Sequence, residues 1–396
     1  MPPSEVFIVG AARTPIGRYG GAFRTVHPAE LGAVAVRAAL TRAGVDGAAV
    51  DEVLMGHARQ GGSGPNPARQ VVRRAGLPDA VPAQTINKAC ASGMQALASA
   101  AQSILLEEAE VVVAGGMESM SRMPYLVDAE DARWGHKMGN FTFVDAMYRD
   151  GFTCSLSGLI MGETADELAK RYGITRDASD MYAVETQRRA AAAVAGGYFR
   201  PEIAPVTVTD SKGRMTVVDA DEHPRPDTSG ESLRRLAPVF AGGITTAGTS
   251  SGITDGGAAV VLMSESRAAA SGAKPLARLI GWASAGVDPR IMGIGPVPAM
   301  RKLFARTGLG MDDFDLVELN EAFAPQVLAV LQDEPVAPDR LNVNGGAIAL
   351  GHPIGCTGTR IVVTLLHELL RRRARRGLAT LCVSGGMGMA MAIERV

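Results

Sequence analysis

The sequence predicts an α/β protein made of two similar halves, each an alternation of strands and helices, with a long segment inserted into the first half. The first observation behind this prediction is an internal repeat. Residues 41–58, TRAGVDGAAVDEVLMGHA, align without gaps with residues 305–322, ARTGLGMDDFDLVELNEA. The alignment places Gly44, Val53 and Ala58 on Gly308, Val317 and Ala322. A repeat of this kind indicates that one supersecondary array occurs twice.

The second observation is that the repeat continues through a helix and a strand. Ser92-Gly93 and Thr357-Gly358 match, and they open helices with apolar periodicity at 91–106 and 357–370. Each helix leads into a short apolar strand that ends in Gly-Gly-Met, once at residues 115–117 and once at 385–387. This order predicts a mostly parallel, helix-covered sheet in each half. Packing the halves face to face would bring the N-termini of the two matching helices together.

The third observation is where the last strand of each half falls. In the second half Gly-Gly-Met runs directly into GMAMAIERV, whereas the matching strand of the first half, GGAAVVLMSE, begins only at residue 256. The inserted residues are richer in aromatic side chains, proline and charge, and we expect a loop domain over the active-site face. The predicted division is a first half of residues 1–117 plus 249–270, an inserted loop domain of 118–248 and a second half of 271–396, with a linker at 264–276.

Composition restricts the kind of protein. The chain has 396 residues and a formal net charge of −1, so no overall field would attract nucleic acid or an anionic membrane. Four cysteines without a disulfide-framework spacing favour free thiols in a reducing cytoplasm. The N-terminal stretch MPPSEVFIVGAARTPIG lacks the pattern of a secretory signal, and no window approaches the length of a membrane span. We therefore expect a soluble, cytoplasmic protein with no metal site.

Three residues carry the predicted chemistry. Cys90 precedes the apolar helix of the first half, where the helix dipole favours a thiolate, and its neighbours are small. His352 lies in GHPIG, just ahead of the matching helix of the second half. Cys382 ends the strand LATLCV, and in the repeat it corresponds to Val112, so a thiol replaces a core aliphatic side chain. If the two helix N-termini meet, Cys90 becomes a nucleophile with a base within reach.

Less specific interpretations compete with this one. A buried cysteine is most often a small apolar side chain, and a histidine in such a loop is commonly structural. Residues 248–252, GTSSG, match the nucleophile elbow of serine hydrolases, but a strand follows where that motif requires a helix. The basic run 371–376 fits a solvated helix C-terminus better than a nucleic-acid site.

Along essentially its whole length the chain resembles the thiolase family of acetyl-CoA C-acyltransferases. The resemblance rests on AARTPIG (11–17), NKACASG (87–93), GGMESMS (115–121), MGETAD (161–166), GITTAGTSSGITDGGAA (243–259), NEAFA (320–324), GGAIALGHPIG (345–355) and C-x-x-G-G-M-G (382–388). It implies a thiolase-like fold of duplicated α/β/α/β/α layers with an intervening loop domain. It also implies a homotetramer of two tight dimers that binds coenzyme A thioesters as substrates and holds no tightly bound cofactor.

The resemblance further implies a role for individual residues. Cys90 would be the acylated nucleophile, His352 its base, and Cys382 the acid or base at the second substrate. Asn320 would join His352 in one oxyanion hole through a water, and the backbone N–H groups of Cys90 and Ser384 would form the other. Arg225 and Ser251 would contact coenzyme A, while Met161 and Phe323 would line the acyl pocket, next to Ile160.

Three positions depart from the commonest pattern of the family. Ile160 stands where short-chain members usually have histidine, Cys356 replaces a small alanine, and Ser384 replaces a frequent glycine. The first two favour a 3-ketoacyl-CoA thiolase of fatty-acid β-oxidation, for which a hydratase/dehydrogenase subunit is a candidate partner. The alternative is a short-chain acetyl-CoA C-acetyltransferase that forms acetoacetyl-CoA.

Two other classes of function fit the sequence less well. A non-catalytic lipid carrier or scaffold of the same fold would be expected to have lost the cysteines or the histidine, which are all present. A ketoacyl synthase would use a second histidine, and Cys382 occupies that place.

Overall fold

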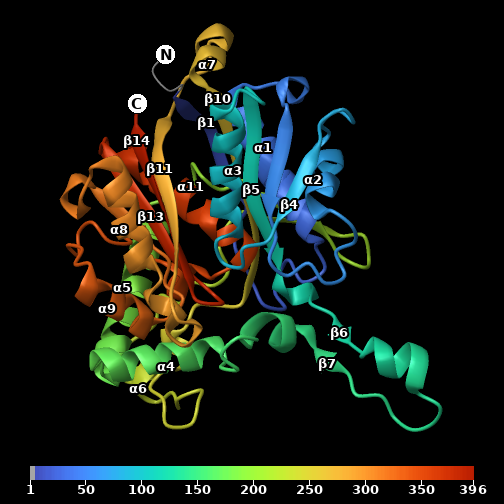
Figure 1. The fold of residues 1–396 in the computed structure, drawn as a ribbon, viewed down its shortest axis with the longest axis vertical. Coiled ribbons are helices and arrows are strands. Elements are labelled where there is room, and N and C mark those ends of the chain that lie inside the picture. The colour runs from blue at the N-terminus through green and yellow to red at the C-terminus, as the bar shows by residue number, and fades with distance from the viewer. Residues whose placement is uncertain (1–4) are drawn as a thin grey trace.

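The computed structural model describes residues 5–396, so the first four residues of the stretch considered for a targeting signal lie outside it. The main strands are β1 (Val6–Arg13), β2 (Gly17–Arg18), β3 (Glu52–Gly56), β4 (Ala83–Ile86), β5 (Val111–Ser119), β10 (Thr254–Ser264), β11 (Ala277–Gly286), β12 (Leu316–Leu319), β13 (Arg376–Val383) and β14 (Met387–Arg395). They run β1-β10-β5-β3-β4 in the first half and β12-β13-β14-β11 in the second, with β2 beside β10 (Figure 1). Pairing of β1 with β11 joins the two halves.

Helices form three layers around these strands. At the centre, α3 (Ser92–Leu105) packs against α11 (Ile354–Arg372), and both contribute to one apolar core with strands of both halves. On the outer face of the first half lie α1 (Pro28–Ala43) and α2 (Pro67–Ala75), and on that of the second half lie α8 (Pro296–Thr307) and α9 (Ala324–Asp333). The predicted α/β/α/β/α layering is confirmed. The shorter elements are α7 (Glu265–Ser271), which lies in the predicted linker, α10 (Ala347–Leu350), η1 (Gly47–Ala49), η6 (Pro289–Ile294) and η7 (Met311–Asp313).

Glycine lets the two central helices approach closely. A Cβ atom on Gly93 of α3 would lie 2.6 Å from Thr359 Oγ1, and one on Gly358 of α11 would lie 2.4 Å from the backbone nitrogen of Met94. These two glycines are equivalent in the repeat, so each half supplies one side of the contact. The contact brings the N-termini of α3 and α11 together, as the repeat predicted.

The prediction of mostly parallel sheets was wrong. In each half the last strand enters the middle of the sheet antiparallel to both neighbours: β10 between β1 and β5, and β14 between β11 and β13. Only β3, β4 and β5, and β12 with β13, pair in parallel. Apolar periodicity identified these strands but carries no information about the direction of their partners.

The proposed match between Cys382 and Val112 was also wrong. Val53 pairs with Val113 and its repeat partner Val317 pairs with Leu378, so Cys382 occupies the position of Met117. The two Gly-Gly-Met motifs are therefore not equivalent in space: the first lies within β5, and the second begins in the turn between β13 and β14.

The inserted segment contributes no strand to the main sheet. It contains η2 (Met120–Arg122), β6 (Tyr125–Leu126), η3 (Glu130–Gly135), β7 (Val144–Asp145), η4 (Tyr148–Phe152), α4 (Met161–Tyr172), α5 (Arg176–Ala195), β8 (Val206–Thr209), β9 (Met215–Val218), α6 (Gly230–Arg234) and η5 (Ala247–Thr249). Helix α4 packs on η6 and α9, and α5 packs on α9 and α10, so these helices cover the second half. In Figure 1, α4 lies below the main sheet and α5 lies beside α9. Strand β5 continues to Ser119, slightly beyond the predicted boundary at residue 117.

Candidate active site

Cys90 sits on a strained turn between β4 and α3. Ala89, immediately before it, has a φ of +45°, which alanine adopts rarely. The turn is closed by hydrogen bonds from Ala91 N to Lys88 O (3.0 Å) and from Ser92 N to Ala89 O (3.0 Å). The Ser92 hydroxyl adds to it by accepting from Lys88 N at 2.8 Å. This geometry fixes the thiol ahead of the first turn of α3.

Cys90 is partly buried, and backbone N–H groups lie near its sulfur. Burial raises its pKa, while the backbone N–H of Ser384, the charge of Arg59 and the N–H of Cys90 itself act in the opposite direction. The backbone N–H groups of residues 90 and 384 therefore both lie near the sulfur. Ser384 begins the turn in which Gly385 and Gly386 have φ values of +87° and +82°, which favour glycine.

His352 is buried as a neutral imidazole with a defined tautomer. Its Nδ1 lies 2.6 Å from Thr357 Oγ1, and that hydroxyl donates to Pro353 O at 3.0 Å. With the single hydroxyl hydrogen directed at Pro353 O, Nδ1 carries the proton and donates it, which leaves the Nε2 lone pair free. Burial, reinforced by the charges of Arg360 and Arg59, lowers the pKa of His352 to about 3. The side chain is therefore an unprotonated base at neutral pH.

Cys382 lies beside Cys90 within an apolar group. It is fully buried, and both burial and the neighbouring Cys90 raise the pKa of its thiol. Met161, Met292, Ala322 and Phe323 pack around it. The structure thus brings together both cysteines and the two residues that were predicted to line the acyl pocket.

Asn320 carries a buried amide without partners. Neither Oδ1 nor Nδ2 has a hydrogen-bond partner within the described part of the chain, although the residue is only 1% exposed. Its backbone nitrogen donates to Thr380 O at 2.9 Å, which places it one strand away from Cys382. An unpaired buried amide costs free energy unless a water or ligand satisfies it. The predicted water-mediated role of Asn320 is compatible with this arrangement.

The other predicted substrate contacts fall into two groups. Ser251 donates its backbone N–H to Ala322 O (3.0 Å), and His352 N donates to Gly252 O (3.0 Å), so Ser251 and Phe323 belong to the same site. Arg225 is exposed, and its backbone N–H is held by Gln187 Oε1 at 2.9 Å. Ile160 precedes α4 and bridges to Thr153, and it does not belong to the group around Cys382.

Glu118 and Thr357 have positions that sequence reasoning missed. The Glu118 carboxylate is completely buried and accepts from the backbone nitrogens of Ala58 (3.2 Å), Arg59 (3.2 Å) and Gly355 (2.9 Å). It therefore fastens the loop after β3 to the start of α11, next to His352. The sequence feature that could have indicated this role is the acidic residue in GGMESMS, which follows an apolar run predicted to be a strand.

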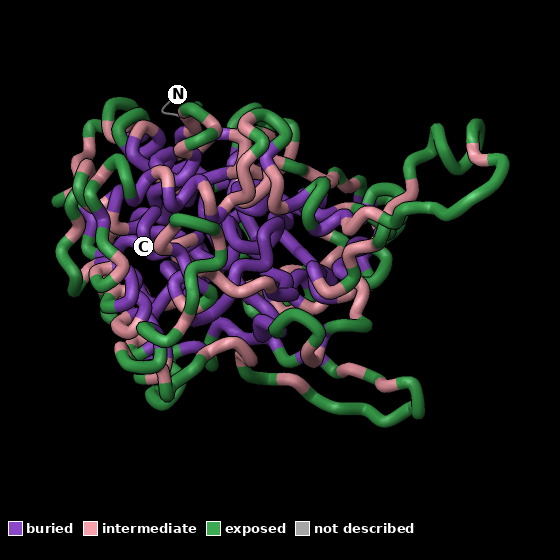
Figure 2. Tube along the Cα trace, turned by 90° about the horizontal axis from the view of Figure 1, so that it is seen from below, coloured by how far each residue is buried: buried purple, intermediate pink, exposed green. Residues whose placement is uncertain are grey.

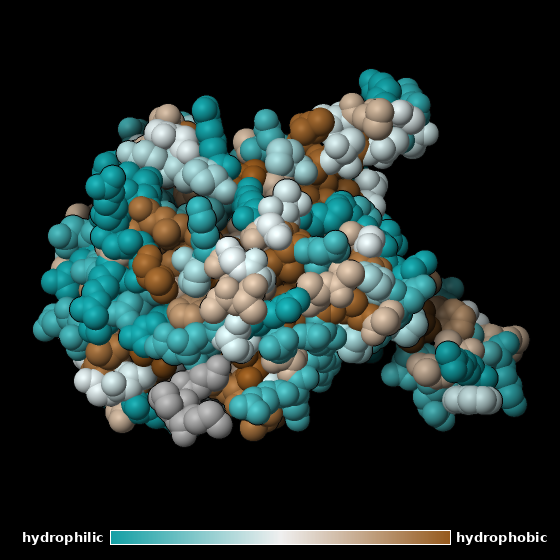
Figure 3. Space-filling model, turned by 90° about the horizontal axis from the view of Figure 1, so that it is seen from above, coloured by the Kyte–Doolittle hydropathy of each residue, from teal (hydrophilic) through white to brown (hydrophobic). Residues whose placement is uncertain are grey.

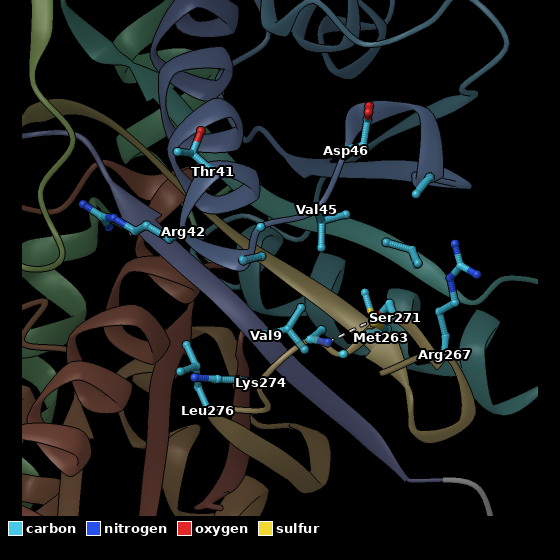
Figure 4. Close-up of a pocket in the computed structure, with 16 residues that line it drawn as sticks. Val9, Thr41, Arg42, Val45, Asp46, Met263, Arg267, Ser271, Lys274 and Leu276 are labelled. Atoms are coloured by element: carbon cyan, nitrogen blue, oxygen red, sulfur yellow. Dashed lines mark hydrogen bonds between the residues drawn. The ribbon is translucent and has the colours of Figure 1, made fainter. Parts of the chain in front are cut away.

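A cavity of about 530 Å³ lies away from these residues, at the end of the sheet near the N-terminus of β1 (Figure 4). Its lining includes Arg42, Arg267 and Lys274, and Ser271 donates to Met263 Sδ at its wall. Arg42 is bound to the carbonyl oxygens of Ala11, Glu202 and Ile203, so its guanidinium is already occupied. The face of the molecule at this end of the sheet is mostly hydrophilic (Figure 3). This cavity has no part in the site around Cys90.

Two further properties concern residues 5–396 as a whole. None of the described helices is long and apolar enough to cross a membrane. Within the same range no group of histidine, cysteine and carboxylate side chains has the arrangement of a metal site.

The two-halved fold, with paired thiols where the halves meet, defines an acyltransferase of the thiolase fold. The chain belongs to the thiolase family: residues 6–266 match the thiolase N-terminal domain and residues 273–395 match the thiolase C-terminal domain.

Individual relatives cover the whole chain. An acetyl-CoA acetyltransferase of Chromobacterium violaceum is 50% identical over 99% of this chain and 100% of its own length. One from Escherichia coli is 49% identical over 98% of each chain. Among solved structures, an acetyl-CoA acetyltransferase of Bacillus anthracis has 45% identity and a TM-score of 0.96 over 99% of both chains. Human mitochondrial 3-ketoacyl-CoA thiolase has 42% identity and a TM-score of 0.95 over 100% of both chains.

Proposed function

We propose that this protein is an acetyl-CoA C-acetyltransferase that moves an acetyl group between coenzyme A thioesters through an acyl group on Cys90. The observation that supports it most is the pair of neighbouring thiols: the partly buried Cys90, with the backbone N–H groups of residues 90 and 384 near its sulfur, and the fully buried Cys382. Donors in such a position would stabilise the oxyanion that forms at a thioester carbonyl.

In the first step, His352 Nε2 would take the proton of the Cys90 thiol. The sulfur then attacks the thioester carbonyl carbon, the bond from that carbon to the sulfur of coenzyme A breaks, and His352 returns the proton to the departing thiolate. The neutral state of His352 supports this role as a base. Asn320 and a water would hold the carbonyl oxygen of the second thioester.

In the second step, Cys382 would move a proton at the α-carbon. During cleavage of a 3-ketoacyl thioester, its thiol protonates the acetyl-CoA carbanion that leaves when the carbon–carbon bond breaks. During condensation, the same sulfur removes that proton. Because burial raises the pKa of Cys382, the protonated thiol is its resting form, which suits the cleavage direction.

The names of the relatives favour the short-chain function over the β-oxidation function that the sequence analysis placed first. Relatives at 46–50% identity over nearly the whole chain are acetyl-CoA acetyltransferases. Cleavage of longer 3-ketoacyl thioesters stays the second candidate, because of the 42% identical human 3-ketoacyl-CoA thiolase and the apolar Ile160. Fatty-acid metabolism and a hydratase/dehydrogenase partner belong to that second candidate.

A thiolysis assay distinguishes the two. We expect kcat/KM for acetoacetyl-CoA to equal or exceed that for 3-ketohexanoyl-CoA and 3-ketooctanoyl-CoA. A rise of about tenfold or more with chain length would support the second candidate, since each buried methylene contributes roughly 0.8 kcal/mol. In that case Ile160→His should flatten the trend, with Ile160→Val as the apolar control.

The remaining features of the proposal concern the whole protein. We propose a cytoplasmic homotetramer that holds no tightly bound cofactor and meets coenzyme A only as substrate or product. Arg225, which is exposed, would contact the coenzyme A moiety, and Ser251 would contact its chain nearer the thioester.

A further inference from the structure

Arg59 is a buried cation without an acidic partner. The residue is 7% exposed, and its guanidinium donates only to the carbonyl oxygens of Asp150 (2.9 Å) and Gly151 (2.8 Å). Its Nε atom has no partner among the described residues. Across residues 5–396, no carboxylate lies within ion-pair distance of this guanidinium, whereas the buried Arg13 is paired with both Glu202 and Asp221. Burial of a charge without an opposite partner lowers the stability of the folded protein, so the position of Arg59 indicates a functional role.

Three contacts place Arg59 beside the nucleophile. The side chain of Asn87, in the turn that carries Cys90, donates to Ala58 O at 3.1 Å. Ala58 packs in one apolar group with Cys90, Ile354 and Phe152, and Phe152 follows the carbonyls that hold the guanidinium. The Glu118 carboxylate also binds the backbone nitrogens of both Arg59 and Gly355. The guanidinium is thus held by residues 150 and 151, and the backbone that carries it contacts the Cys90 turn and is joined through Glu118 to the start of α11.

The charges that face the two reacting groups come from few residues. Around the Cys90 thiol they are Arg59 and Glu118, with the neutral Cys382 thiol next to it. Around His352 they are Arg360 and Arg59. Glu118 is already engaged by three backbone donors and lies 3.1 Å from His57 Nε2, and Arg360 faces Glu318 at 3.5 Å. Arg59 is the cation common to both groups.

We propose that Arg59 is a positioning residue for the acyl-transfer reaction: its uncompensated charge stabilises the thiolate of Cys90. The inference rests on the proposed role of Cys90 as nucleophile. When the proton passes from sulfur to His352, negative charge develops on Cys90, and a nearby cation in a poorly screened site favours it. The same charge opposes a lasting positive charge on His352, so the proton is readily returned to the leaving thiolate.

The alternative is that Arg59 only anchors residues 150–152. Arg59→Gln keeps an amide donor for those carbonyls but removes the charge, and Arg59→Lys keeps the charge. Arg42→Gln is a matched control, because Arg42 also binds only backbone carbonyls but lies near the separate cavity. Far-UV circular dichroism and thermal unfolding verify folding, and Arg59→Met replaces Arg59→Gln if the latter does not fold.

The readout is the pH dependence of Cys90 alkylation by iodoacetamide, followed by peptide mass mapping. We expect the neutral variants to raise the midpoint by about one pH unit and to slow alkylation at pH 7 by about tenfold, while Arg59→Lys and Arg42→Gln stay near the unmodified protein. An unchanged midpoint in the neutral variants, or an equal shift in Arg59→Lys, would overturn the proposal. Alkylation requires no thiolase turnover, so absence of acetyl transfer in the unmodified enzyme would count against the proposed function separately.

Discussion

At the scale of single residues, the state of His352 depends on Thr357. One hydroxyl accepts from Nδ1 of the imidazole and donates to Pro353 O, and this fixes which nitrogen is basic. Neither contact can be inferred from the motif GHPIGCTG, because both contacts form only when the first helical turn brings residue 357 back over residue 353. The Thr357 hydroxyl therefore determines which nitrogen of His352 is basic, although it does not itself take part in the reaction.

Replacement of Thr357 tests this dependence. In Thr357→Val the Nδ1–H loses its acceptor inside the protein, at a cost of about 1–3 kcal/mol, and the base loses its fixed tautomer. We expect kcat/KM for acetoacetyl-CoA thiolysis to fall by about ten- to hundredfold. Thr357→Ser, which keeps the hydroxyl, should retain most of the activity. Unimpaired thiolysis by the valine variant would show that the tautomer is set in another way.

The residues of the site were predictable to different degrees. Cys90, His352 and Cys382 stand beside glycine-rich turns, and the repeat brings two of them to equivalent helix starts. Arg59 and Glu118 were not identified, since their importance comes from partners in three dimensions: backbone carbonyls for one and three backbone N–H groups for the other. Ile160 was expected at the pocket wall, but only its neighbour Met161 packs near Cys382.

At the scale of elements, the crossing of α3 and α11 determines where the two halves meet. The predicted helices at 91–106 and 357–370 correspond to Ser92–Leu105 and Ile354–Arg372, so periodicity located both within a few residues. Strand direction could not be predicted, because β10 and β14 insert between strands that are distant in the chain. Register also escaped prediction, and so the apparent match of Cys382 with Val112 failed.

Gly358→Ala tests the close packing of the two central helices. In an isolated helix this change would stabilise by up to about 1 kcal/mol. Here the new methyl group would lie 2.4 Å from Met94 N, and we expect a net loss of about 1–3 kcal/mol in the free energy of unfolding, measured with urea. Gly230→Ala at the start of α6, where the nearest atom is Arg234 Nη1 at 3.9 Å, is the control and should change little. A stabilised Gly358→Ala protein would contradict the packing described.

At the scale of the whole molecule, a projecting arm suggests how subunits assemble. Residues 124–147, which include β6, η3 and β7, extend away from the body (Figure 1) and are mostly exposed (Figure 2). Trp134 and Met138 on this arm are 77% and 90% exposed, and Tyr125 and Phe143 are also exposed. Large apolar side chains on an extended arm are typical of a surface that another subunit covers. The insertion was evident in the sequence, but its projection from the body was not.

A paired substitution on the arm tests its role in the proposed homotetramer. We expect Trp134→Ser/Met138→Ser to shift the sedimentation coefficient from that of a tetramer to that of a dimer, with kcat changed less than about threefold, because both residues lie away from the cysteines. Met215→Ser, at a similarly exposed methionine on β9, should leave the tetramer intact. Identical sedimentation of the arm variant and the unmodified protein would exclude this contact.

The central claim is that Cys90 carries the acyl group and that Cys382 transfers a proton at the α-carbon. Peptide mass mapping after incubation with acetyl-CoA tests this claim most directly. In Cys382→Ser we expect one acetyl group per subunit on Cys90, without formation or cleavage of acetoacetyl-CoA, because only proton transfer at the α-carbon has been removed. In Cys90→Ala we expect no acetyl group and no turnover. Acetylation of Cys356 or Cys382 in the unmodified protein, or near-normal thiolysis by Cys382→Ser, would contradict the claim.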